Sequence, residues 1–186
     1  MAIRDIAMMG NDVLKRVAEP VEDPSAPEIA ELARDMRETL ENIASTGIAA
    51  PQVFVSKRLF VYRVPEHLIP PGSKLKPISW RVVINPVLEP LVEEKEPIGF
   101  EKCLSIPGLH GQVPRHARVR VRVQQLDGSA IEITAAGYHA RLLQHEYDHL
   151  DGILYPQRMT DMTELAFNSE LGDQFFIPRD PALFVE

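Results

Sequence analysis

Two histidines four positions apart, with a glutamate directly after the first, form the pattern in this chain that could do chemistry most directly. They are His145, Glu146 and His149, in the segment LLQHEYDHLDG at 142–152. On an α-helix, residues i and i+4 lie on the same face one turn apart, so both imidazoles can reach one metal ion. Two histidines do not complete a catalytic metal site, and a third protein ligand is expected from elsewhere in the chain.

The segment around this pattern predicts a helix over residues 137–151, with Gly152 as its stop signal. The leucines of this helix fall largely on the same side as the two histidines and the glutamate. A carboxylate on an apolar, inward face is costly unless a cation or hydrogen-bonding partners compensate its charge. The arrangement therefore favours a metal site over an exposed amphipathic helix.

The sequence leaves two sources of a third ligand open. Extended HExxH peptidases place another histidine where this chain has Tyr155, so that pattern fails. A glutamate from a later segment could bind the ion, and Glu164 and Glu170 are candidates. A thiolate could bind it as well, and Cys103 is the one cysteine in the chain, although a lone cysteine is commonly a small buried apolar residue.

Two further segments contain residues suited to a site. Cys103 lies in FEKCLSIPG at 100–108, at the close of a strand-like region before a Pro-Gly turn, where it can face a helix packed on a sheet. The segment STGIAAPQV at 45–53 contains small residues that let the backbone approach another group closely. It also contains Gln52, whose side-chain amide is a hydrogen-bond donor.

The remaining chain predicts one more long helix and several strands. Apolar residues in 27–43 recur at i, i+3, i+4 and i+7, which indicates a helix packed on a sheet. The predicted strands are 59–64, 80–86, 86–92, 117–126 and 127–134, with an Asp-Gly turn joining the last two, and 163–171 predicts a short helix. This order predicts an α+β fold in which antiparallel or mixed β-sheets pack around a central helix carrying HExxH, in a single domain over 1–186.

Composition and charge exclude several classes of function. The 186 residues are 45% hydrophobic and carry a net charge of −7, so a global basic footprint for nucleic acid is absent. Arg118, Arg120 and Arg122 alternate with valines, and we expect a solvated sheet face there rather than a nucleic-acid stripe. No apolar run approaches the roughly 18 residues that cross a membrane. The N-terminal segment lacks the apolar core of a signal peptide, so a cytoplasmic protein is expected.

Three of these segments together resemble the peptide deformylase family. Its members carry, in this order, Ala-Ala-x-Gln, Glu-Gly-Cys-Leu-Ser and Gln-His-Glu-x-Asp-His-Leu-x-Gly, and this chain has STGIAAPQ, EKCLS and QHEYDHLDG. MMGNDVLKRVAEPV at 8–21, INPVL and VPRHARVRV are similar to other parts of the family, so the resemblance covers nearly the whole chain. The chain departs from the family at Ser45 and Lys102, where the family has glycines. Lys102 adjoins Cys103 and bears on the catalytic rate more than on the fold.

The resemblance implies a site that holds one divalent metal ion, with water as the fourth ligand. Ferrous iron is the first expectation for the ion, with zinc, nickel or cobalt as alternatives. Glu146 would take a proton from the water and pass it to the leaving amine. The side-chain amide of Gln52 and the backbone N–H of Leu104 would stabilise the oxyanion. The protein ligands that the resemblance implies are Cys103, His145 and His149.

The resemblance also implies the substrate and the partners. The substrate would be an N-formylmethionyl peptide of a nascent protein, cleaved to formate and a free amino terminus. Gly47 and Ile48 would pair with the extended peptide through their backbone, and Ile48 and Leu142 would form walls of an apolar slot for the methionine side chain. The tail at 167–186 is not the basic helix that some relatives use to dock on ribosomes, so a ribosome contact is not predicted. Its aromatic residues are expected to pack rather than to form a dimer: Phe175, Phe176 and Phe184.

Two other functions stay open on the sequence. One is a zinc endopeptidase with Glu170 as the third ligand, which leaves Cys103 and Gln52 without a role. The other is a relative that binds metal or a formyl peptide with little or no turnover, which the cation of Lys102 motivates.

Overall fold

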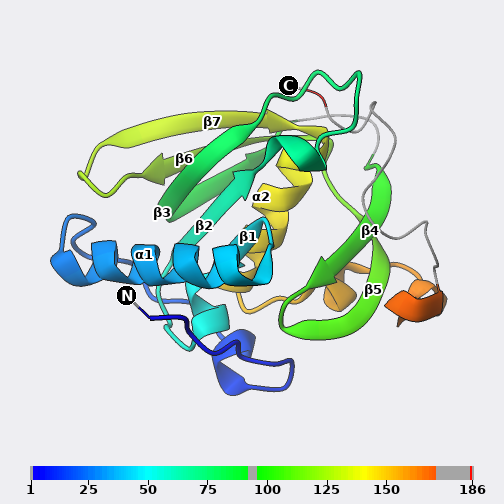
Figure 1. Cartoon of the computed structure of the whole chain (residues 1–186), viewed down its shortest axis with the longest axis horizontal. Coiled ribbons are helices and arrows are strands. Elements are labelled where there is room, and N and C mark those ends of the chain that lie inside the picture. The colour runs from blue at the N-terminus through cyan, green and yellow to red at the C-terminus, as the bar shows by residue number, and fades with distance from the viewer. Residues whose placement is uncertain (1, 92–95, 171–184, 186) are drawn as a thin grey trace.

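Two antiparallel sheets and two α-helices form the fold of the residues that the computed structural model describes, which are 2–91, 96–170 and 185 (Figure 1). The helices are α1 (Pro27–Ile43) and α2 (Gly137–Leu150). The larger sheet has the strand order β1-β2-β3-β6-β7, formed by β1 (Gly47–Ala49), β2 (Leu59–Val64), β3 (Ile78–Pro90), β6 (Arg118–Gln124) and β7 (Ala130–Ala136). The smaller sheet has the order β4-β5-β8, formed by β4 (Ile98–Cys103), β5 (Ile106–Pro114) and β8 (Ala166–Phe167).

Helix α2 lies at the centre, between the five-stranded sheet and the β4–β5 hairpin (Figure 1). On the sheet side, its Ala140, Leu143 and Leu150 share one core cluster with the alternate valines of β6. Because strand side chains alternate between faces, those valines are buried as the sequence predicts. The predicted α+β fold with a central helix is confirmed.

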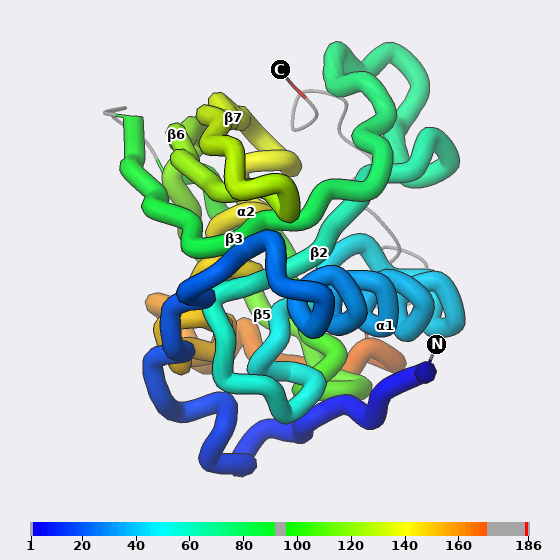
Figure 2. The backbone as a smooth tube through the Cα atoms, turned by 90° about the vertical axis from the view of Figure 1, so that its left-hand side faces the viewer, coloured from blue at the N-terminus to red at the C-terminus, as the bar shows by residue number. Residues whose placement is uncertain are grey.

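Helix α1 covers the opposite face of the same sheet. Its Leu32, Met36 and Leu40 form a second core cluster with Val61 of β2 and Ile84 of β3. Figure 2 shows from the side how β2 passes between the two helices. The sheet is therefore covered on both faces. The face of α2 that carries His145 and His149 is turned away from the sheet.

Several predicted elements have the predicted bounds. The helix over 27–43 and the strand over 59–64 are confirmed residue for residue. Helix α2 begins at Gly137 as predicted and ends at Leu150. The hairpin between β6 and β7 turns at Asp127 and Gly128, where Gly128 has φ +78°. Local patterns were sufficient here because α1 buries one apolar stripe and β2 is a short apolar run that is buried on both faces.

Strand β3 corrects the prediction of two separate strands at 80–86 and 86–92. Residues 78–90 form one strand that bends at Asn85, which has φ +47°, and its register shifts between Ile84 and Val87. The Asn85 carboxamide accepts a hydrogen bond from Val21 N–H at 2.9 Å and donates one to Val21 O at 2.8 Å. These bonds hold the irregularity in place, so the strand continues instead of ending. Residue 92 lies outside the described part.

Two other predictions were wrong. The turn after Cys103 falls at Leu104 and Ser105, because Cys103 pairs with Ile106, and Pro107 and Gly108 belong to β5. The segment 163–170 is not a helix: β8 pairs with β5 between two short 3-10 turns, since the open edge of β5 accepts it. Residue 171 lies outside the described residues.

The arginines of β6 face acids on neighbouring strands. Arg120 pairs with Glu132 at 3.2 Å, and Arg122 pairs with Glu89. These pairs support the expectation of a solvated sheet face. In the described part of the chain, no helix has the length and apolar character that crossing a bilayer requires. The tail residues Phe175, Phe176 and Phe184 lie outside the described residues.

Gly152, two positions beyond the end of α2, packs closely against the N-terminal segment. It has φ +72°, and a Cβ there would lie 2.7 Å from the backbone N of Arg16. Gly128 has a similar φ of +78°, with no atom within 4 Å of a Cβ. We expect Gly128→Ala to cost about 1 kcal/mol from backbone strain alone.

Gly152→Ala should cost at least about 2 kcal/mol more, because backbone atoms cannot give way as a flexible side chain can. Urea unfolding of the two variants measures the difference. Equal losses in both variants would show that the N-terminal segment does not pack on Gly152 as described.

Candidate metal centre and adjoining cavity

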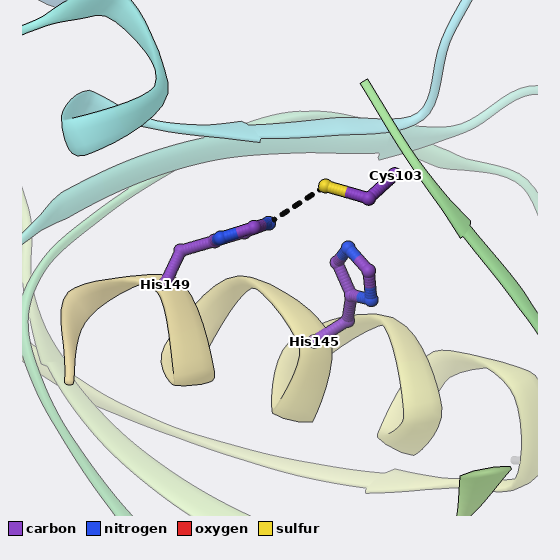
Figure 3. A group of neighbouring side chains, drawn as sticks. All are labelled: Cys103, His145 and His149. Carbon is purple, nitrogen blue, oxygen red and sulfur yellow. Dashed lines mark hydrogen bonds between the residues drawn. The ribbon is translucent and has the colours of Figure 1, made fainter. Parts of the chain in front are cut away.

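Three side chains from two distant elements converge at the inner face of α2 (Figure 3). His145 and His149 come from α2, and Cys103 comes from the end of β4. One potential ligand atom of each lies within 4.8 Å of the other two, and Cys103 Sγ is 3.3 Å from His149 Nε2. Ligands of one tetrahedral ion, at about 2.0–2.3 Å from it, lie roughly 3.3–3.6 Å apart, so the spacing suits one ion. This sulfur and nitrogen donor set fits a divalent transition metal.

A buried carboxylate orients the first histidine. Glu101 Oε2 lies 2.8 Å from His145 Nδ1, which leaves Nε2 of that ring for the ion. Arg115 donates to both Glu101 oxygens at 2.8 and 2.9 Å, and Arg141 donates to Oε1 at 2.9 Å. Glu101 and Arg115 thus form a buried ion pair, with side chains 4% and 5% exposed. The two guanidinium groups keep the carboxylate ionised and fixed.

The same network reaches the helix that carries the histidines. Arg115 donates to Asp148 at 2.6 Å, and Arg158 donates to the other oxygen of Asp148 at 2.7 Å. Glu101 and Asp148 are both buried, and burial alone would raise the pKa of Glu101. For Glu101, the hydrogen bonds and charges of Arg115 and His145 outweigh burial and hold its pKa far below the usual range. The hairpin and α2 are thereby joined by ion pairs directly behind the site.

The charge on Cys103 follows from the two imidazoles. Burial opposes ionisation of the thiol, but the nearby His149 and His145 outweigh it and hold the pKa of Cys103 well below its ordinary value. A thiolate is the form that binds metals. The sulfur is therefore poised as an anionic ligand.

Glu146 lies beside this group with one oxygen unsatisfied. Among the described residues, its Oε2 is buried without a hydrogen-bond partner. Burial raises the pKa of Glu146 to about 7, although His145 and His149 act in the other direction. A Cβ on Gly47 would lie 2.3 Å from Glu146 Oε1, so only glycine leaves room for this carboxylate. The carboxylate can exchange a proton near neutral pH with a group in the adjoining space.

Gln52 and Leu104 lie on the other side of Cys103. Gln52 is in a 3-10 turn (Ala50–Val53), and its Nε2 lies 3.4 Å from Cys103 Sγ. Leu104 directly follows Cys103 in the β4–β5 turn. Gln52 therefore places a side-chain N–H donor beside the sulfur, and Leu104 carries the next backbone N–H along the chain.

A cavity of about 860 Å³ opens from this group between α2, β1 and the β4–β5 hairpin. Seven of the nine residues predicted for the site line it: Gly47, Gln52, Cys103, Leu104, Leu142, His145 and Glu146. His149 is buried behind them, at 1% exposure. Ile48 is fully buried in the α1-side core cluster, so its side chain is not a wall of the cavity. Side chains alternate along β1, which is why Gly47 and Ile48 face opposite ways.

The two departures from the family pattern both lie at this cavity. Ser45 is half-buried and precedes β1, and Lys102 is exposed. Along β4, Glu101 and Cys103 are buried while Lys102 between them is not, because neighbouring side chains take opposite faces. The Lys102 side chain therefore lies at the cavity rim, on the face of β4 opposite Glu101 and Cys103.

Sequence reasoning missed four side chains close to the site. Glu101 was not linked to His145, and Asp148, Ser105 and Tyr155 were not assigned to the site. The Tyr155 ring stacks on His145, with centroids 6.4 Å apart and planes at 23°. Asp148 carries a signal that could have been used, since it is an acid on the inward side of a mostly buried helix.

A cysteine sulfur and two imidazoles beside a buried carboxylate, at the inner end of a cavity, form a candidate mononuclear metal site of the kind that hydrolases use. The comparisons with known proteins name the family. The family model described as polypeptide deformylase matches residues 3–164. The chain belongs to the peptide deformylase family.

The relatives cover most of the chain. Peptide deformylase 2 of Ralstonia nicotianae is 42% identical over 169 residues, covering 91% of this chain and 94% of the relative. The Met-Ala-Ser-bound crystal structure of class I type b peptide deformylase from Acinetobacter baumannii is 34% identical with a TM-score of 0.77, and covers 85% of this chain and 99% of that one. Peptide deformylase from Ehrlichia chaffeensis is 31% identical with a TM-score of 0.78, covering 88% and 91%. The solved structures that share this fold belong to the same family as the sequence relatives.

The choice between a thiolate and a carboxylate ligand can be tested by metal binding. Glu170 is exposed and is not part of the described metal-ligating group. We expect Cys103→Ala to weaken zinc affinity by more than about 100-fold, since even outer partners of a ligand are worth 10- to 100-fold. Glu170→Gln should bind as the wild type does.

Competition with a chromophoric chelator measures both affinities, and circular dichroism checks that both variants fold. Retention of metal by Cys103→Ala together with its loss from Glu170→Gln would reverse the assignment and support the endopeptidase alternative.

Proposed function

We propose that this protein is a metal-dependent hydrolase that removes the formyl group from formyl-methionyl peptides and releases formate. The observation that carries the proposal is the group of Cys103, His145 and His149, with the unsatisfied oxygen of Glu146 beside it at the inner end of a cavity. The relatives named peptide deformylase support the same reaction.

The roles of the site residues follow from their chemistry. Cys103, His145 and His149 would hold the divalent ion, which would supply a Lewis acid and lower the pKa of water towards neutrality. Glu146 accepts the proton of the attacking water and gives it to the leaving amine, a role that suits a carboxyl group with a pKa of about 7. Gln52 Nε2 and the N–H of Leu104 donate hydrogen bonds to the oxyanion.

The substrate peptide pairs with the free edge of β1. Arg63 N–H donates to Thr46 O at 2.8 Å, and Gly47 lies opposite Tyr62 in the antiparallel ladder. Alternation along the ladder turns the N–H and C=O of Gly47 away from β2, towards the cavity that this residue lines. An extended peptide can therefore add as a strand at Gly47, with Ile48 anchoring β1 in the core.

The methionine side chain occupies the cavity beside His145. Leu142 lies one turn before His145 on α2, lines the cavity and supplies apolar surface. The occupant that we propose for the metal site is ferrous iron, with zinc, nickel or cobalt able to replace it, because a mixed thiolate and imidazole set accepts all of these ions. We propose that the chain 1–186 acts as one domain in the cytoplasm, where formylated nascent chains are made.

Release of formate from formyl-Met-Ala-Ser tests the function. The protein purified anaerobically with ferrous iron, or loaded with nickel, should release formate. Glu146→Ala should lose at least about 100-fold in kcat, because general acid–base catalysis contributes roughly 10²–10⁴-fold. Metal content is measured alongside, since Glu146 is not a ligand. A fully metal-loaded wild type that releases no formate would contradict the proposal.

Lys102 raises a second candidate function, a relative that binds formyl peptides with little or no turnover. The structure favours the enzyme, because the Lys102 side chain is exposed at the rim while the ligands face inward. We expect Lys102→Gly to change kcat/KM by less than about 5-fold, as surface charges act weakly through water. Steady-state kinetics of the two proteins decides. A wild type near zero with a rate restored by glycine would favour the binding-only alternative.

A further inference from the structure

The amide of Gln52 is held by three hydrogen bonds. Its Oε1 accepts from the Ala49 N–H at 2.9 Å. Its Nε2 lies 3.4 Å from Cys103 Sγ and 3.2 Å from Ser105 Oγ. A backbone N–H can only donate, so the bond to Ala49 fixes which end of the amide carries the hydrogens. The NH₂ group therefore faces Cys103, where the reaction takes place.

Ser105 is the polar side chain that shares this NH₂ group with the sulfur. It is 1% exposed and lies two positions after Cys103, in the two-residue turn between β4 and β5. One NH₂ hydrogen can go to Ser105 Oγ while the other points towards Cys103. Ser105 thus restricts rotation of the amide that the Ala49 bond alone would allow.

The backbone around Gln52 and Ser105 is joined by the N-terminal segment. Ala7 N–H donates to Gln52 O at 2.8 Å, and Met9 N–H donates to Ser105 O at 2.8 Å. In the view of Figure 2, the dark-blue N-terminal segment runs below α1. Two segments far apart in the sequence are therefore fixed relative to each other, which a hydrogen bond between their side chains requires.

The N-terminal segment is itself anchored on α1. Arg4 pairs with Asp35 at 2.9 Å, and the Arg4 N–H donates to Thr39 Oγ1 at 3.0 Å. Asp35 and Thr39 are both buried. Residues 7–9, which join Gln52 to Ser105, therefore continue from a segment that is fixed on α1.

We propose that Ser105 is a positioning residue, which aims the side-chain amide of Gln52 at the oxyanion through the bond between Nε2 and Oγ. This inference rests on the proposed function and deepens it. The amide must already point at the position where negative charge develops, because a donor that has to reorient loses much of its effect. Ser105 provides that orientation without touching the substrate.

A double-mutant cycle tests this role. Gln52→Ala removes the donor and should lower kcat by about 10²–10³-fold. Ser105→Ala keeps the Gln52 amide but removes the hydrogen bond that restricts its rotation. It should lower kcat by about 10- to 100-fold with little change in KM. The double variant should be no slower than Gln52→Ala, since Ser105 acts through Gln52. Ser129→Ala, in the exposed β6–β7 turn, is the matched control and should keep the wild-type rate.

A cobalt-substituted protein gives a second measurement that needs no turnover. Gln52 donates towards the Cys103 sulfur, and a hydrogen bond to a thiolate lowers its electron-donating power. Loss of that bond should move the sulfur-to-cobalt charge-transfer band to longer wavelength. Ser105→Ala and Gln52→Ala should shift the band in the same direction, while Ser129→Ala should not.

Two results would overturn the inference: multiplicative losses of rate in the double variant, or an unmoved cobalt band in a folded Ser105→Ala protein. Urea unfolding identifies a variant that fails to fold, and Ser105→Gly, which also removes the hydroxyl group and suits a turn, then replaces alanine in both measurements. A wild type without formate release would contradict the proposed function instead, and the cobalt spectra would still report whether Ser105 orients Gln52.

Discussion

The contact between one sulfur and two imidazoles is the interaction on which the rest of the structure depends. Cys103 Sγ lies 3.3 Å from His149 Nε2, although 46 positions separate the two residues. The histidines are fixed by a helix packed on the larger sheet, and the sulfur is fixed by a hairpin of the smaller sheet. The site exists only where side chains of the hairpin and of α2 meet.

Bringing charged groups into that contact has a cost that the surrounding ion pairs offset. Glu101 and Asp148 are buried acids, and Arg115 donates hydrogen bonds to both. The Arg115 side chain is itself buried, at 5% exposure. Removing one partner of such a buried pair costs about 3–5 kcal/mol, because the other charge is left uncompensated. The network therefore does two things at once. It joins the hairpin to α2, and it sets the ring orientation of His145 on which the ligand geometry depends.

How much the sequence could predict depended on the distance over which each interaction acts. The spacing of His145 and His149 is a property of one helix turn, so their shared face was predictable. The bond of Glu101 to His145 spans 44 positions and depends on the packing of two sheets, which no local pattern reports. The side-chain direction of Ile48 was missed for a similar reason, because a three-residue strand is too short for its alternation to be read.

The same reasoning explains the errors in the strands. Asn85 and Pro86 have the composition of a strand end, yet bonds from Asn85 to Val21, 64 positions away, keep the strand continuous. Pro107 and Gly108 have the composition of a turn, but pairing of Cys103 with Ile106 had already closed the hairpin. The family resemblance was stronger evidence than these patterns because it joined three distant segments into one site. Even so, it did not include Ser105 among the residues that orient Gln52.

The most direct measurement of the central claim is X-ray absorption at the edge of the bound metal, on protein loaded with zinc. A zinc site formed by Cys103, His145 and His149 should give one sulfur scatterer at about 2.3 Å together with two imidazole nitrogens at about 2.0–2.1 Å. Replacing Cys103 by alanine should remove the sulfur shell and leave the nitrogens. A wild-type spectrum with only nitrogen and oxygen scatterers would contradict the account, because Cys103 would then be a buried thiol beside a metal site built from other ligands.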